Sequence, residues 1–241
     1  MALAKMSFDE LNQLVGYKVS EPYEEYYEPM QISREQKRKR IELAERLDEV
    51  FLAMLMECFY AEQLGTIVSL DIVERTRQEY RQAVSEVIDS PEYEEAIYEE
   101  LYGNSSRYAD LDNYIINHGT ELITTTLLVL YNHRDDPYYY SADRARAIAE
   151  GDSNSIWNNT EYEEAVKSGR NPSTGRSYKY KTWHTIMDGH ERDSHATVNG
   201  MTIPINEPFH LAGGDCYYPR DDSLGMSDEE IVNCRCSLTF S

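Results

Sequence analysis

Apolar residues recur at three- and four-residue intervals through most of the chain up to Gly169, which predicts a series of helices. The clearest run extends from about Ser33 to Gln63, where Ser33 and Gln36 resemble a capping box and Gly65 follows as a stop. The same intervals predict further helices over Asp71–Ile88, Ser90–Gly103, Leu111–His133 and Ser141 to about Gly169. Within Leu111–His133 the segment TTTLLVL leaves a strand as an alternative, because β-branched residues favour strands.

The pattern changes after Gly169 to short alternating stretches at Met201–Ile205 and Cys236–Phe240, separated by turn-forming residues. At the other end, residues 1–32 hold a small apolar cluster and then SEPYEEYYEP, whose prolines and acids oppose regular structure. We therefore predict an α+β fold, with a mainly helical N-terminal part followed by a small mixed α/β C-terminal domain. The expected segments are an extended N-terminal arm at 1–32, a helical domain at 33–141 and a C-terminal domain at 142–241.

The formal charge of −21 disfavours nonspecific nucleic-acid binding over the whole surface, because carboxylates repel phosphates. One basic stretch, between positions 167 and 181, stands out because it contains no acid. It is either a solvated hairpin, which the composition favours, or a site of DNA contact. Its basic residues are Lys167, Arg170, Arg176, Lys179 and Lys181. The opening of the helix at Ser33, with the sequence REQKRKR, is interpreted as a solvated face.

Four cysteines in 241 residues do not form a dense disulfide framework, so we expect a reducing compartment. The apolar segments are too short to span a bilayer, and the N-terminus lacks the pattern of a secretory signal. Tyrosine occurs 20 times, against two tryptophans and five phenylalanines. A ring with a polar tip suits half-buried contacts between subunits, which points weakly to assembly.

From Arg144 onward, a set of short motifs follows a fixed order. An Ala-Arg-rich helix precedes a Trp, an Asp-x-x-x-Arg-x-x-His element, a Gly, a Phe, a Pro-containing loop and a final Asn-Cys-Arg-Cys. This order resembles the phage Mu F-like minor head proteins, or phage head morphogenesis family, over about the last hundred residues. The matching positions are Asn158, Gly169, Trp183, Asp188, Arg192, His195, Gly200, Phe209, Pro219, Asn233, Cys234, Arg235 and Cys236.

The resemblance implies a phage minor head (capsid) protein that acts in head morphogenesis near the portal and assists genome packaging or delivery. Its implied partners are the portal protein, the major capsid protein or both, with packaged DNA as a further candidate. The implied location is the host cytoplasm during assembly and then the procapsid or virion. Within this frame, we expect the acidic helical half to contact partners and no enzymatic activity.

Asp188, Arg192 and His195 admit a structural and a catalytic interpretation. If the segment is a helical turn, Asp188 and Arg192 pair on one face, with Trp183 buried beside them and Gly200 reversing the chain. The alternative is an enzyme, a nuclease or transferase-type effector, that uses the three residues for acid–base chemistry. The structural role is favoured, because the sequence shows no nucleophile elbow, glycine-rich phosphate loop or HExxH helix.

Cys234 and Cys236 are two residues apart, so in a strand both thiols face the same side. Together with His195 and either Cys216 or His210 they would supply zinc ligands of suitable type. The spacing is not that of a standard Cys-x-x-Cys knuckle, and small thiols in a core strand are commoner. The sequence therefore predicts no cofactor, with zinc as the open alternative.

Overall fold

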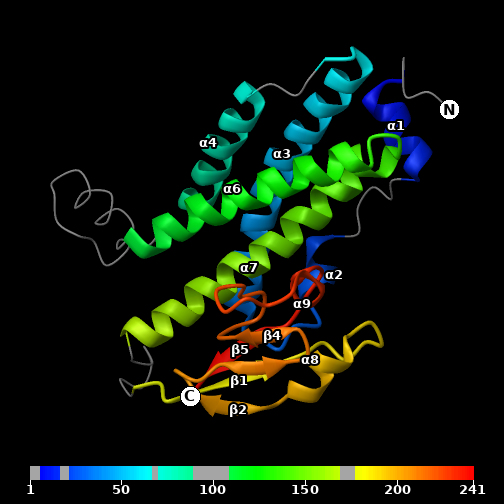
Figure 1. The fold of residues 1–241 in the computed structure, drawn as a ribbon. Helices are drawn as coiled ribbons and strands as arrows, with labels where there is room; N and C mark the ends of the chain where they lie inside the picture. Colours follow the sequence, from blue (N-terminus) through cyan, green and yellow to red (C-terminus); the bar gives the residue numbers. More distant parts are fainter. Residues whose placement is uncertain (1–5, 17–21, 67–69, 89–108, 169–176) are drawn as a thin grey trace, which may run out of the picture. The chain divides into compact units, whose positions relative to one another are not determined.

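The computed structural model describes residues 6–16, 22–66, 70–88, 109–168 and 177–241. The chain forms two compact units. Unit 1 contains Met1–Glu21 and Glu42–Ala149, and unit 2 contains Pro22–Ile41 and Glu150–Ser241. Two long helices, α3 (Arg34–Gln63) and α7 (Ala142–Ser168), contribute residues to both units. In Figure 1 these helices are coloured blue and yellow-green.

Unit 1 is helical and has an aromatic core. Besides its parts of α3 and α7, it contains α1 (Phe8–Val15), α4 (Leu70–Val87), α6 (Ala109–Asn132) and the 3₁₀ helix η1 (Pro137–Tyr140). The Phe51 and Tyr80 rings meet edge to face, with centroids 6.2 Å apart. A Cβ on Gly119 would lie 2.4 Å from the Tyr80 ring, so glycine at this position lets α6 approach α4.

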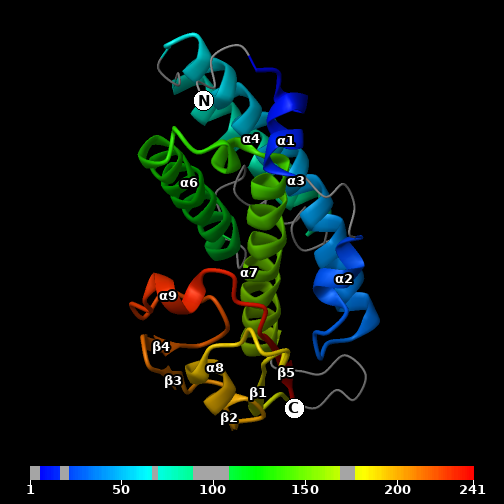
Figure 2. The same ribbon diagram turned by 90° about the vertical axis from the view of Figure 1, so that its right-hand side faces the viewer.

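Unit 2 combines the start of α3 and the end of α7 with two small sheets. Strand β1 (Tyr180–His184) lies between β2 (Thr202–Pro204) and β5 (Ser237–Phe240) in an antiparallel sheet. The second sheet pairs β3 (Phe209–Leu211) with β4 (Gly214–Cys216). Three short helices complete the unit: α2 (Tyr23–Tyr27), α8 (Asp193–Val198) and α9 (Asp228–Ile231). Figures 1 and 2 both show α8 beside β1 and β2.

The segment of α7 from Gly151 to Thr160 is buried at every position, although many of its side chains are polar. Buried polar groups need hydrogen-bond partners. The main partner is Arg40 of α3, which is fully buried. Its guanidinium donates to Asn154 Oδ1 at 3.1 Å and Asn158 Oδ1 at 3.2 Å, and it binds both carboxylate oxygens of Glu161 at 2.8 and 2.9 Å.

The two asparagines use their remaining hydrogen-bonding groups on the C-terminal segment. Asn154 Nδ2 donates to the carbonyls of Cys234 and Cys236, at 3.4 and 3.2 Å. Asn158 Nδ2 donates to the carbonyls of Pro219 and Cys236, at 3.4 and 3.1 Å. These contacts form one arginine–asparagine network, which links α3, α7 and the segment before β5.

The structure confirms the predicted α+β fold class and most of the predicted elements. Ser33 and Gln36 exchange the two capping hydrogen bonds, and Gly65 takes a left-handed φ of 64° after α3. The segment TTTLLVL is helical, within α6, so the strand alternative is wrong. Strands β2 and β5 lie within the two predicted stretches. The helix expected at Ser90–Gly103 lies outside the described residues.

Three expectations require correction. The extended arm at 1–32 is wrong for residues that form α1 and α2, where Phe8, Leu11 and Tyr27 are buried. Ser7 and Glu10 form a capping box that starts α1, a local signal stronger than the nearby acids and prolines. Arg40 does not belong to a solvated face. The compact units also divide the chain at other points than the expected segments. In the described part of the chain, no helix is both long and apolar enough to span a membrane.

Replacing Arg40 tests the arginine–asparagine network. Arg40→Met keeps the apolar stem but leaves the partly buried Glu161 carboxylate and two buried amide oxygens without their cation. We expect the free energy of unfolding of unit 2 to fall by about 3–5 kcal/mol. Urea unfolding followed by tryptophan fluorescence measures this directly, because Trp157 and Trp183, the two tryptophans of the chain, both belong to unit 2.

The matched control is Arg38→Met, two residues away on the same helix. Arg38 forms an exposed pair with Glu35, so its replacement should leave the unfolding curve nearly unchanged. If the unfolding curve of Arg40→Met were as little changed as that of Arg38→Met, the buried network would not stabilise unit 2.

Candidate functional site

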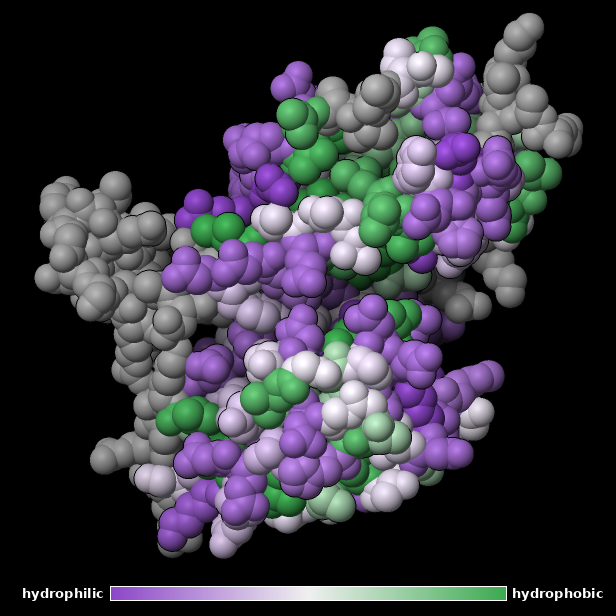
Figure 3. Space-filling view, viewed as in Figure 1, coloured by the Kyte–Doolittle hydropathy of each residue, from purple (hydrophilic) through white to green (hydrophobic). Residues whose placement is uncertain are grey.

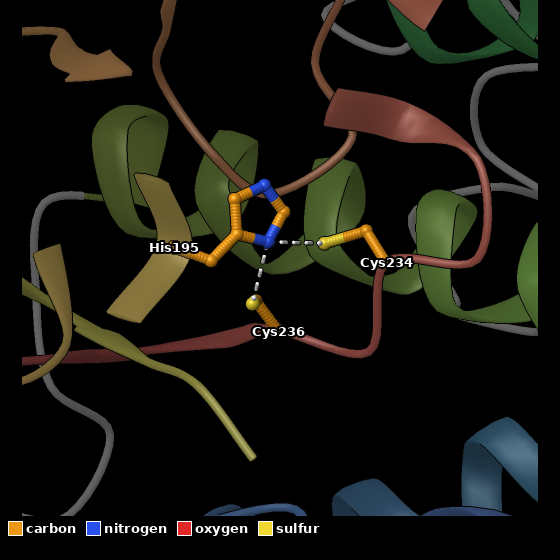
Figure 4. A group of neighbouring side chains, drawn as sticks. All are labelled: His195, Cys234 and Cys236. Atoms are coloured by element: carbon orange, nitrogen blue, oxygen red, sulfur yellow. Dashed lines mark hydrogen bonds between the residues drawn. The ribbon is translucent and has the colours of Figure 1, made fainter. Parts of the chain in front are cut away.

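Three potential metal ligands meet inside unit 2, and we call them the thiol–imidazole cluster: His195, Cys234 and Cys236. His195 Nδ1 lies 3.8 Å from Cys234 Sγ and 3.4 Å from Cys236 Sγ. All three ligand atoms lie within 4.8 Å of one another, and all three residues are buried. Figure 4 shows both contacts converging on the same ring nitrogen.

The backbone before β5 presents both thiols to the histidine. Asn233 has a left-handed φ of 56°, which turns the chain before Cys234. The carbonyls of both cysteines accept hydrogen bonds from Asn154 of α7, which fixes the orientation of this segment. The two thiols share one site as the sequence analysis expected, although both cysteines precede the strand rather than belong to it.

The opposite edge of the His195 ring, which carries Nε2, lies beside a buried carboxylate. His195 Nε2 lies 2.9 Å from Glu230 Oε2, while no aligned hydrogen-bond acceptor for Nε2 exists among the described residues. Glu230 is itself held by Ser194 Oγ, which donates at 2.7 Å, and by the Gly213 N–H at 3.1 Å. A Cβ on Gly213 would lie 2.6 Å from Glu230 Cγ, so this glycine makes room for the carboxylate.

The cluster has strongly perturbed proton affinities. Burial opposes a charge on His195, but the Cys234 thiol and the Glu230 carboxylate outweigh it and raise the pKa of His195. The hydrogen bond from Cys236 lowers the pKa of Cys234 well below its usual range, against burial and with help from His195. The same bond to Cys234, together with burial, raises the pKa of Cys236. The proton affinities of the three residues therefore depend on one another.

Thr185 joins the cluster to the core of unit 2. Its hydroxyl donates to the carbonyl of His195 at 2.8 Å and accepts from Trp183 Nε1 at 3.0 Å. Cys236 Sγ also lies 3.5 Å from this hydroxyl. Trp183 is buried, as predicted, and its ring meets those of His195 and Phe209 edge to face. The ring of His195 is thus fixed by contacts on several sides.

A cavity of about 400 Å³ adjoins the cluster. Three kinds of side chain surround it: the cluster itself, neighbouring polar groups and two cations. Its lining includes Thr185, His190, Glu191, Arg192 and Arg235, together with the three residues of the cluster. The three residues of the cluster therefore border a space large enough for a small molecule or water.

The structure separates the predicted Asp188–Arg192 pair, which is a correction. Asp188 pairs instead with Arg235, and this hydrogen bond lowers the pKa of Asp188. Arg192 donates to the carbonyl of Val232 and precedes α8 as its N-cap residue. Residues 188–192 are not helical, so the four-residue spacing does not align the two side chains. Gly200 has a φ of 75° and reverses the chain into β2, as expected.

A further correction concerns Lys181. It was a candidate for DNA contact, but its side chain is fully buried in β1. Its ammonium donates to the carbonyl of Tyr217 at 2.8 Å and lies about 5 Å from the ring centres of Tyr162, Phe209 and Tyr217. Burial lowers the pKa of Lys181 to about 8. Lys179 is exposed, while Gly169, Arg170, Arg176 and the side chain of Lys167 lie outside the described residues.

Sequence reasoning missed three residues that position the cluster: Arg40, Asn154 and Glu230. A signal existed for one of them, because Asn154 lies four residues before Asn158 and therefore on the same helix face. Of the two proposed fourth zinc ligands, neither joins the cluster. The His210 ring is 75% exposed and pairs with Asp215, and Cys216 is buried in the core outside the group.

Comparison with known proteins extends the picture. A family model described as Phage Mu protein F like protein matches residues 77–239, which is more than half of the chain. The chain belongs to this family. The Mu F-like match covers β1, α8, the cluster and most of β5, and it begins at α4, well before residue 142.

The Mu F-like chain is also 29% identical over 106 residues to the NAD(+)--arginine ADP-ribosyltransferase EFV of Enterococcus faecalis (strain ATCC 700802 / V583). The similar stretch covers 44% of this chain and 20% of the relative. The chain therefore spans about a fifth of that relative's length. No solved structure matches the chain significantly.

The pairing of Asp188 can be tested by double-mutant cycles. We expect a coupling of about 0.5 kcal/mol between Asp188→Asn and Arg235→Gln, and none between Asp188→Asn and Arg192→Gln. Because Arg235 lowers the pKa of Asp188, the coupling is complete above the usual aspartate pKa and is lost as the pH falls through the lowered value. Urea unfolding at several pH values measures it. A larger coupling to Arg192 would contradict the observed geometry.

Proposed function

We propose that this Mu F-like protein is a phage minor head protein that acts in head morphogenesis near the portal. The observation that carries the proposal is the family match, which spans helices of unit 1 and almost all of the strand-containing part of unit 2. We propose the portal protein, the major capsid protein or both as partners. The proposed location is the host cytoplasm during assembly, followed by the procapsid or virion.

The surface of unit 1 supports a role in protein contacts. Several large apolar side chains of this unit are exposed: Leu64, Leu70, Leu128 and Tyr131. On the face shown in Figure 3, apolar residues lie among hydrophilic ones. We propose that unit 1 binds the head partner. Unit 2, which the arginine–asparagine network stabilises, is in this proposal a rigid module.

Charge favours a protein partner over DNA. Residues before Ser141 carry 13 Lys and Arg against 28 Asp and Glu, so this part repels phosphates and suits a basic protein surface. The alternative of a DNA-binding module between Lys167 and Lys181 loses Lys181, which is buried. Lys179 remains exposed and available. Any contact with packaged DNA is therefore a minor part of the proposal.

The enzymatic alternative loses its original geometric basis. Asp188 and Arg192 each bind another group, and His195 is buried between thiols and a carboxylate. The ADP-ribosyltransferase is similar over only 20% of its own length, which does not transfer its activity to this chain. Nuclease activity or NAD-dependent modification of arginine by the purified chain, abolished by His195→Ala in a folded protein, would favour the enzyme.

The proposal predicts that the chain is present in heads. Proheads and DNA-filled heads purified from the encoding phage should contain the chain in a fixed ratio to portal protein, measured by quantitative mass spectrometry. Cross-links should join it to portal or capsid subunits, and cryo-electron microscopy should place it near the portal. Its absence from every particle, immature and mature, would overturn the proposed function.

Variants test whether unit 1 makes the contact. Leu128→Lys with Tyr131→Lys on α6 should lower incorporation into heads at least several-fold, because charged groups replace apolar contact area. The matched control is Val232→Lys, an exposed apolar residue of unit 2, which should leave incorporation unchanged. Equal loss in both variants, or loss in the control alone, would contradict a contact through unit 1.

A further inference from the structure

We propose that His195, Cys234 and Cys236 form a zinc site, in which the fourth ligand is a water molecule from the adjoining cavity. The proposal rests on the convergence of one imidazole nitrogen and two thiol sulfurs from separate parts of unit 2. Nitrogen and thiolate sulfur are the ligand types that zinc prefers in proteins. Nothing in the proposed head function requires or implies this metal.

The distances between the ligand atoms fit a tetrahedral ion. With Zn–S near 2.3 Å and Zn–N near 2.05 Å, a tetrahedral site separates nitrogen from sulfur by about 3.6 Å. The observed separations from His195 Nδ1 are 3.4 and 3.8 Å, on either side of that value. The sulfur atoms also lie within 4.8 Å of each other, and the same tetrahedron has a sulfur–sulfur edge of roughly 3.8 Å. Only small side-chain movements are needed to admit the ion.

The surroundings of His195 match those of a metal-bound histidine. Such histidines usually present their second nitrogen to a carboxylate, which fixes the tautomer and the ring orientation. Here Glu230 lies 2.9 Å from Nε2, and Ser194 and Gly213 hold the carboxylate in place. A metal on Nδ1 leaves the proton on Nε2, facing Glu230. His195 Nε2 is buried, and no described residue offers it a hydrogen-bond acceptor at a suitable angle. With a metal on Nδ1, the role of this nitrogen is to carry the proton that faces Glu230.

The cysteine side of the site is equally well supported. The carbonyls of both cysteines are held by Asn154, and that of Cys236 also by Asn158. The Cys236 thiol lies 3.5 Å from the Thr185 hydroxyl and donates to it, which fixes the direction of the sulfur. These contacts fix the segment that carries both sulfurs before any ion binds. Preorganisation of this kind lowers the cost of binding a metal.

The fourth position faces the cavity rather than another protein ligand. Cys216 and His210 do not belong to the cluster, and the cavity of about 400 Å³ reaches all three of its residues. A site with three protein ligands leaves room for water. Arg192 and Arg235 also line this cavity, so an anion in solution is a second candidate for the open position.

The first test measures metal in the purified full-length chain. Protein expressed with zinc supplied and purified under reducing conditions without chelator should contain about one zinc per chain by plasma mass spectrometry. X-ray absorption should show two sulfur ligands near 2.3 Å and nitrogen or oxygen ligands near 2.0 Å. Cobalt added to metal-free protein should give visible absorption bands of tetrahedral intensity and a thiolate-to-metal charge-transfer band.

Variants separate ligands from neighbouring thiols. Cys234→Ala and Cys236→Ala should each lose most of the bound metal, while Cys58→Ala, a buried thiol of unit 1, should keep it. Cys216→Ala should also keep it, and its loss of metal would overturn the proposed open fourth position. Chelation should lower the melting temperature of unit 2 in wild-type protein, read by tryptophan fluorescence, and should not do so in Cys234→Ala.

Wild-type protein keeps the proposal falsifiable if the cysteine variants fail to fold. Folded wild-type chain that contains no zinc and takes up neither zinc nor cobalt would overturn it, and would leave the cluster as a set of hydrogen-bonded thiols. Metal retained equally in Cys58→Ala and Cys234→Ala would overturn it as well. These measurements use the isolated chain, so their failure is distinct from absence of the protein from phage heads.

Discussion

The burial of the Arg40 guanidinium is the constraint on which the architecture of unit 2 depends. A buried charge is tolerated when it is paired and fully hydrogen-bonded, and Arg40 meets this condition through Glu161, Asn154 and Asn158. The arginine fixes the orientation of both amides, because it occupies their oxygens. Their nitrogens must then point at carbonyls, and those carbonyls belong to Pro219, Cys234 and Cys236.

The two units therefore maintain their structure by different physical means. Unit 1 relies on aromatic and aliphatic packing, with Phe51, Phe59 and Tyr80 at its centre. Unit 2 has an apolar cluster around Trp183, but its part of α7 is buried through hydrogen bonds instead. Directional bonds define a single arrangement more strictly than apolar packing does. This difference suits a unit that brings His195, Cys234 and Cys236 together in one geometry.

The sequence predicts the elements of the fold better than the contacts between them. Helical spacing and capping residues are local signals, so α3, α6 and α7 follow from them, and alternation predicts β2 and β5. The capping box at Ser7 is equally local, although the acids and prolines that follow it predict irregular structure. The partners of Asp188 and Arg40 lie 47 and more than 110 residues away, and no spacing rule reaches across such distances.

The cluster shows the same division between local and long-range information. The sequence identified His195, Cys234 and Cys236 as suitable ligands, because their residue types are visible in the chain. It did not identify Glu230, and it proposed Cys216 or His210 as a fourth ligand. Both matters depend on how β3, β4 and α9 fold back on α8, which the residue pattern does not encode locally. The same limit explains the wrong expectation for Lys181. A basic stretch predicts exposed side chains, and the sequence does not show that three aromatic rings enclose one of these lysines.

The position of Arg40 also limits how the Mu F-like region can be exchanged between proteins. The family match begins at residue 77, so the cation that neutralises Glu161 and orders the two amides comes from outside the matched region. A longer protein that took over residues 77–239 of this chain alone would inherit a partly buried acid without its counterion. Such a protein must either supply a cation from another segment or replace the acid and amides together. Recombination at residue 77 would therefore separate Glu161 and the two amides from the arginine that binds them.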